Sequence, residues 1–331
     1  MTKQSFRLAG WASALLTLAS TASADVKLNE NFSVSGYISG SVSHTEWEDS
    51  TGASTDDSFM DVDAVKLTSM ATFEKVSGTV SLHTFTSQDP VVLDAFATYT
   101  LDGGSSVTFG KFLSYLGFEA FDYPNMLQIS YANSLGAFIP AYHSGVRYDF
   151  SGEGFSGGVA VLDSVYGATY YKGDGDLDNG AGFEGYLKYT KGDSSIFAGV
   201  AVDGGVAGGY DDQFTFDLWG QTKVGNVTLA AEYCYSKLDA AGGGDADGYF
   251  WLLLAMAPIN DKWTITGRIS GGEDETLATG SGTPSFFKAT ISPAVTLTPN
   301  LGILFEYSHI KYDDFAVDSS SFIGAQVIFK F

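Results

Sequence analysis

The sequence is poor in three kinds of residue, and each scarcity excludes a class of protein. Cys234 is its one cysteine, so no internal disulfide can form. Lysine and arginine total 17 against 39 acidic residues, and the resulting net charge of −22 repels nucleic acid. The 4 histidines are dispersed without metal-ligand spacing. We therefore expect no nucleic-acid partner, no metal centre and no cofactor.

Long hydrophobic runs are also missing once the amino terminus is passed. After residue 24 the chain has no stretch of about 18 consecutive apolar residues, which excludes helical membrane spans. Before it, Lys3 and Arg7 precede an apolar run over 8–18, and Ala22-Ser23-Ala24 supplies small residues for cleavage. The run is short for a retained membrane anchor, the alternative interpretation. We predict a signal peptide over 1–24 and a mature domain over 25–331.

What the sequence does contain is short segments of alternating apolar and polar residues. Residues 32–43 place Val34, Ile38 and Val42 on one face and serines on the other, and about sixteen such segments follow one another to residue 331. An isolated strand cannot satisfy its backbone in lipid, whereas a closed barrel can. The pattern, with 40 glycines and 15% aromatics, predicts an all-β fold: a transmembrane antiparallel up-and-down β-barrel of about 16 strands.

The connections between these segments alternate in length. Short turns such as 102–104 and 298–300 lie at one rim, which is the asymmetry of an outer-membrane barrel. The longer connections, rich in Asp, Gly and Ser, are expected over 46–60, 166–180, 203–212, 238–247, 271–283 and 313–319.

One interval, 110–146, breaks the alternation. It is rich in aromatic residues and contains Pro124 and Pro140, so it is expected to form a long loop after the fifth strand rather than another strand. Aromatic residues need burial against something. We interpret 113–141 as a loop folded into the barrel, where it narrows a channel. The alternative is a loop that lies over the outer rim like the other long connections.

Alternation also assigns the basic residues to faces of the strands. A charge on the lipid face costs roughly 2–4 kcal/mol at the midplane, so lysine and arginine within strands are expected on the inner face. A basic wall opposite acidic loop residues would create a transverse field that discriminates among ions. The residues predicted to form this basic inner wall are Lys66, Arg147, Lys188, Arg268 and Lys288.

The interval also carries a family resemblance. The sequence resembles the OmpL-like β-barrel porin family, although Ser144 replaces the usual Thr and Leu116 stands where Pro is often found. The residues that carry the resemblance are Gly110-Lys111-Phe112, Gly117-Phe118-Glu119, Tyr123-Pro124-Asn125, Ser130-Tyr131 and His143-Ser144-Gly145-Val146. The final strand, ending in Phe331, likewise resembles the signal that outer-membrane proteins present to the barrel assembly machinery.

The resemblance to porins implies both a function and a site. It implies a channel in the bacterial outer membrane, not an enzyme, for passive diffusion of ions and small hydrophilic solutes, surrounded by lipids and lipopolysaccharide. Porins of this size are often trimers, but no feature of the sequence fixes an oligomer. The alternative is a non-conducting surface barrel such as an adhesin. The residues implied to form the constriction are Tyr115, Glu119, Phe121, Asp122, Tyr123 and Asn125.

Overall fold

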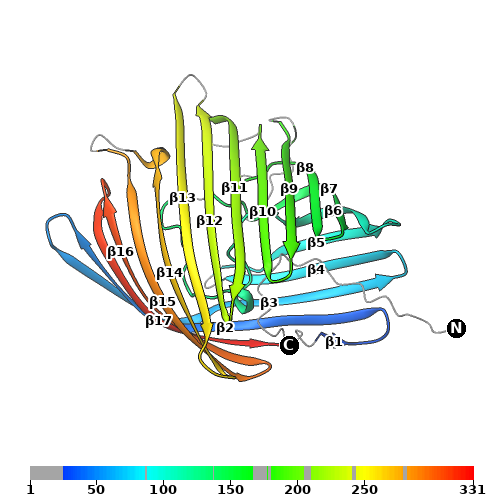
Figure 1. Cartoon of the computed structure of the whole chain (residues 1–331), viewed down its shortest axis with the longest axis horizontal. Coiled ribbons are helices and arrows are strands. Elements are labelled where there is room, and N and C mark those ends of the chain that lie inside the picture. Colours follow the sequence, from blue (N-terminus) through cyan, green and yellow to red (C-terminus); the bar gives the residue numbers. More distant parts are fainter. Residues whose placement is uncertain are drawn as a thin grey trace.

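A single antiparallel sheet closes on itself to form the wall of the molecule (Figure 1). The structure is a computed structural model, which describes residues 25–85, 88–136, 138–166, 177, 180–204, 210–240, 244–278 and 282–331. Its sheet has 17 strands, of which β1 (Val26–Lys27) is a two-residue addition paired with β2. The other sixteen form the barrel, as predicted. The predicted signal peptide lies outside the described residues.

The wall strands follow one another in chain order, and each pairs with the next. The barrel closes where β17, red in Figure 1, returns beside β2, blue. The strands are β2 (Phe32–Asp49), β3 (Ser54–Phe73), β4 (Val76–Phe85), β5 (Val91–Thr100), β6 (Ser105–Leu113), β7 (Tyr142–Gly152), β8 (Phe155–Leu162), β9 (Gly182–Lys191), β10 (Ser194–Asp203), β11 (Tyr210–Val224), β12 (Val227–Ala240), β13 (Asp245–Pro258), β14 (Trp263–Asp274), β15 (Ser285–Thr298), β16 (Leu301–Asp313) and β17 (Val317–Lys330).

The two faces of the wall differ as the alternation predicts. On β12 and β13 the side chains of Leu229 and Leu253 are exposed on the outer face, whereas those of Cys234 and Leu252 on the inner face are fully buried. Aromatic pairs such as Phe155–Tyr189 and Trp263–Phe305 lie at the strand ends beside the short turns. An apolar outer face bordered by aromatic rings suits a hydrocarbon environment. No helix among the described residues is long and apolar enough to cross a membrane.

The prediction of an acidic loop over 46–60 is wrong. These residues form a regular hairpin, in which Glu46 pairs with Asp56 and Trp47 with Thr55, so only residues 50–53 make the connection. Other predicted loops shorten in the same way: β12 continues to Ala240 and β14 to Asp274. The reason is that backbone hydrogen bonds between strands continue where both faces of a strand are polar. Apolar and polar side chains no longer alternate there, so the sequence does not indicate that the strand continues.

Candidate functional site

The connection between β6 and β7, residues 114–141, departs from the strand pattern of the wall. It contains a short 3-10 helix, η1 (Tyr123–Asn125), with Pro124 in its first positions. Gly117 has φ +102°, and a Cβ there would lie 2.9 Å from Ile139. Such a backbone cannot join a β-ladder, so its N–H groups need other partners. We call residues 114–141 the β6–β7 segment.

Those partners are acidic side chains of the wall. A carboxylate accepting from a backbone N–H forms a charge-assisted hydrogen bond, which is stronger than a bond between neutral groups. We call the following residues the anchoring carboxylates: Glu184, which accepts from the N–H of Tyr115 (3.2 Å); Asp217, from Gly117 (2.8 Å); Glu232, from Phe118 (2.7 Å); Asp274, from Gly136 (3.1 Å); and Glu306, from Ile129 (2.6 Å) and Ser130 (3.0 Å).

The anchoring carboxylates are buried, with exposed fractions from 0% for Asp217 to 5% for Glu232. They belong to β9, β11, β12, β14 and β16, so the β6–β7 segment contacts strands far apart on the wall. A buried carboxylate without donors would cost several kcal/mol. The segment and the carboxylates therefore satisfy one another, and neither would be stable in this arrangement alone.

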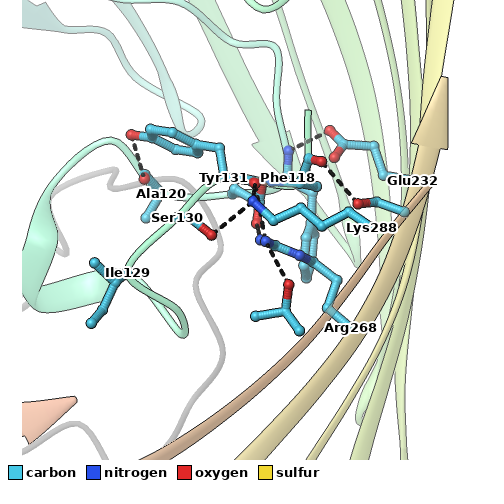
Figure 2. A network of polar contacts seen from close by, with 12 residues as sticks. Phe118, Ala120, Ile129, Ser130, Tyr131, Glu232, Arg268 and Lys288 are labelled. Atoms are coloured by element: carbon cyan, nitrogen blue, oxygen red, sulfur yellow. Dashed lines mark hydrogen bonds and ion pairs between the residues drawn. The ribbon is translucent and has the colours of Figure 1, made fainter. Parts of the chain in front are cut away.

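Basic residues of β14 and β15 bind the middle of the segment (Figure 2). The guanidinium of Arg268 contacts the carboxylate of Glu119 and donates a hydrogen bond to the carbonyl of Tyr131 at 3.0 Å. The ammonium of Lys288 donates to the same carbonyl and to the hydroxyl of Ser130, both at 2.8 Å. Two predicted wall cations and one predicted constriction residue thus meet in one network.

A second group of contacts holds the segment at β3. The Nζ atom of Lys66 lies 3.0 Å from the carboxylate of Asp122 and 3.2 Å from that of Asp94 on β5. The hydroxyl of Tyr37 on β2 donates to Asp122 at 3.3 Å and contacts His83 at 2.9 Å. The contacts of Tyr37, His83 and Asp94 with the segment and with Lys66 were not predicted from the sequence. For Asp94 a signal existed, since it interrupts the apolar residues 91–97.

Two further predicted constriction residues, Phe121 and Tyr123, pack against wall residues. Phe121 packs edge-on against Tyr142, with ring centroids 5.1 Å apart, and Tyr123 against Tyr37 at 6.0 Å. Asn125 closes η1, its N–H donating to the carbonyl of Asp122 at 2.9 Å.

Tyr115 joins the segment to β7 and β9. Its hydroxyl donates to Asp149 at 2.9 Å, and its ring lies 4.6 Å from that of Tyr186. Burial and the neighbouring Asp149 carboxylate raise the pKa of the Tyr115 phenol well above its usual value, so it stays a donor at any physiological pH. Gly158 makes room for this ring, because a Cβ there would lie 2.7 Å from the Tyr115 hydroxyl.

Among the residues that the structure describes, the two remaining predicted wall cations, Arg147 and Lys188, contact no acidic residue of the segment. Arg147 lies 3.3 Å from Asp149 on its own strand, and its guanidinium lies 4.6 Å from the centre of the Phe112 ring. Lys188 lies over the ring of Trp219, 5.5 Å from its centre. The expected opposition of charges across water is therefore replaced by direct contact at Asp122 and Glu119.

Buried apolar groups lie between the segment and the wall. Each of the four buried clusters combines a residue of the segment with residues of the barrel or its connections. The segment residues in these clusters are Leu116, Ala132, Phe138 and Ala141. The apolar core of this protein is thus the contact between one segment and the inner face.

A cavity of about 720 Å³ remains beside the segment. Its lining includes all five of Lys66, Tyr115, Glu119, Asp122 and Arg147, together with wall residues up to β13. No group of three or more His, Cys, Asp or Glu in the described part of the chain is arranged to hold a metal ion. The site is therefore a polar and aromatic cavity bordered by ion pairs.

Solved porin structures share this fold. OmpF from Salmonella typhi, solved with daunomycin, superimposes with a TM-score of 0.69 at 14% identity, covering 93% of this chain and 100% of that one. The outer membrane channel DcaP of Acinetobacter baumannii gives 0.69 at 16%, with the same coverage. An anion-selective porin from Comamonas acidovorans gives 0.68 at 13%, covering 91% and 99%. At these identities the likeness concerns the fold.

Sequence comparison gives the family. A search of curated proteins finds no match. The family model described as "Putative beta-barrel porin-2, OmpL-like" matches residues 60–331, which is most of the chain and includes the whole β6–β7 segment. The chain therefore belongs to the OmpL-like beta-barrel porin-2 family.

Proposed function

We propose that this protein is an outer-membrane porin, a water-filled channel through which ions and small hydrophilic solutes diffuse passively. In this proposal residues 1–24 direct export, and the β6–β7 segment lies across the lumen as its constriction. The observation that carries the proposal is the spread of the segment's partners, from Lys66 on β3 through Asp217 on β11 to Glu306 on β16. A segment that contacts such distant strands of a closed sheet crosses its interior.

The same contacts determine how much net charge the constriction carries. Asp122 and Glu119 are each paired with a cation, so their charges are largely compensated. We therefore propose that the segment limits the size of solutes more than it sorts ions by a transverse field. Lipids and lipopolysaccharide surround the barrel, and the barrel assembly machinery inserts it.

A non-conducting surface barrel is the second candidate, because the same dense contacts would also suit a barrel closed by its own loop. The test is single-channel recording of the purified mature chain in a planar bilayer. Stable ohmic steps support the porin. Silence from protein that is folded, as judged by heat-modifiable electrophoretic mobility, would support the closed barrel.

The assembly is a separate proposal. One structure that shares the fold is the in-vitro folded trimer form of OmpT from Vibrio cholerae, with a TM-score of 0.65 at 15% identity, covering 91% of this chain and 100% of that one. We propose a homotrimer by analogy, to be tested by light scattering with correction for bound detergent.

A further inference from the structure

The basic residues of the inner wall differ in what they bind. Lys66, Arg147 and Arg268 each contact a carboxylate, and Lys288 donates to the segment. The side chain of Lys188 makes no ion pair or hydrogen bond within the described part of the chain. Its half-buried ammonium therefore lacks an acceptor in a place where bulk water is partly excluded.

A second donor without a partner lies beside it. The indole Nε1–H of Trp219 is buried and has no hydrogen-bond partner among the described residues, and the residue itself is 6% exposed. Lys188, Phe197 and Trp219 face one another across three neighbouring strands, and Lys188 lies over the indole ring at 5.5 Å. Both residues line the 720 Å³ cavity. Two unused donors on one wall point to a ligand that supplies acceptors.

The protein itself offers this pair no free carboxylate among the residues lining the cavity. Each of the lining acidic groups already accepts from at least one donor. The pairs are Asp94 with Lys66, Asp122 with Lys66, Glu119 with Arg268, Asp149 with Arg147 and Tyr115, and Glu232 with the N–H of Phe118. Among the described residues that line the cavity, no carboxylate is therefore left to accept from Lys188 and Trp219.

The remaining lining indicates what the rest of the ligand is like. Rings of Phe96, Tyr115 and Tyr186 are half-buried and line the same cavity, so they present flat apolar surface to it. The volume lies within the range of roughly 300–1,000 Å³ that small-molecule sites occupy. Of the cations that line the cavity, Lys66 and Arg147 are paired with carboxylates, so Lys188 alone among the described lining residues is left to compensate a charge on the ligand. One unpaired cation suits a single negative charge, which argues against a phosphate or a dicarboxylate.

We propose that Lys188 and Trp219 mark a binding subsite for an aromatic monocarboxylate. The carboxylate of the solute accepts from the ammonium of Lys188 and the indole N–H of Trp219, and its ring packs against Tyr186 and Tyr115. This inference rests on the proposed porin function, of which it names the solute class. It assigns Lys188, rather than the paired cations, as the group that attracts the solute.

The test uses benzoate as the probe and the folded mature chain in detergent, with binding followed by saturation-transfer NMR. Wild type should show saturable benzoate binding, and Lys188→Met should weaken it about tenfold or more, because one charged hydrogen bond is lost. Lys188→Arg should retain most of the affinity, and Trp219→Phe should weaken it by a smaller factor. Benzamide, which has the ring without the charge, should bind poorly.

Lys75→Met is the matched control, since Lys75 is an exposed turn residue paired with Asp102 and should leave binding unchanged. Benzoate binding that is absent, or equal in wild type and Lys188→Met, would overturn the subsite and leave water as its occupant. Conductance in potassium chloride is recorded on the same samples. Steps without benzoate binding refute the subsite alone, whereas binding without steps refutes the porin and keeps the subsite.

Discussion

The wall and the β6–β7 segment satisfy their backbone groups in opposite ways. In the wall, each strand pairs with its neighbour through main-chain hydrogen bonds that any residue except proline can make, as between β12 and β13. In the segment, main-chain N–H groups donate to side chains from remote strands, such as Glu232 and Glu306. The structure of the wall therefore depends on a repeated main-chain pairing that many residues can make. The position of the segment depends on individual side chains.

This difference predicts where substitutions matter. A substitution on the inner wall that removes a partner of the segment should loosen the segment and leave the barrel closed, because the ladder hydrogen bonds remain. Hydrogen exchange of segment amides and the unfolding temperature of the barrel, measured on the same samples, distinguish the two regions.

The largest effect is expected from Arg268→Met. It leaves Glu119 without its cation and the carbonyl of Tyr131 without its guanidinium donor. Removing one partner of a buried ion pair costs about 3–5 kcal/mol. Amide exchange at Ala132, whose N–H donates to Glu119, should rise by about a hundredfold or more. Adding Glu119→Gln should restore part of the protection, and a strictly additive double variant would contradict the pairing.

A smaller effect is expected from Glu306→Ala. This change removes the acceptor of two backbone N–H groups, those of Ile129 and Ser130, at a cost of roughly 1–3 kcal/mol. Exchange should accelerate at these two amides and not at Gly117, which is bound by Asp217. Glu306→Gln keeps an acceptor oxygen, so it should cost less. Equal acceleration along the whole segment would show that it opens as one unit.

Gly158→Ala tests the fit of Tyr115 against the wall. The added Cβ would lie 2.7 Å from the Tyr115 hydroxyl, so the ring must shift, at a cost of about 1–3 kcal/mol. Gly185→Ala on the adjacent strand is the matched control, since its nearest neighbour would lie at 3.5 Å. Exchange at the Tyr115 amide should increase in the first variant only. The same behaviour in both would remove the steric argument.

The smallest effect is expected from Lys75→Met. Lys75 and Asp102 form an exposed ion pair between two short turns, with side-chain exposures of 52% and 95%. Such pairs contribute little, because water and salt screen them. The unfolding temperature of the barrel should not change measurably. A clear decrease in the unfolding temperature would mean that this exposed ion pair contributes to the stability of the wall.

The sequence predicted the wall well for a physical reason. Alternation reports the two environments of a strand, so it predicted an antiparallel barrel of about sixteen strands, which the structure has. It failed at the far rim, where Glu46 and Asp56 pair although both faces are polar. Pairing there is a property of the backbone, which leaves no trace in hydropathy.

The contacts of the candidate site were less predictable. Alternation assigned no role to the anchoring carboxylates Glu184, Asp217, Glu232 and Glu306. The role depends on which N–H groups of residues 114–141 approach them, and that approach brings together positions more than a hundred residues apart, as for Phe118 and Glu232. No periodicity within either element encodes such a distance.

We propose that the β6–β7 segment crosses the lumen and narrows it. Leu113 and Tyr142 form a cross-strand pair, so residues 114–141 can be replaced by a two-residue Asn-Gly turn without opening the ladder. Single-channel conductance of this variant is the most direct measurement. We predict stable steps several times larger than those of wild type. Steps of unchanged size from a folded variant would contradict the claim and place the segment away from the pore.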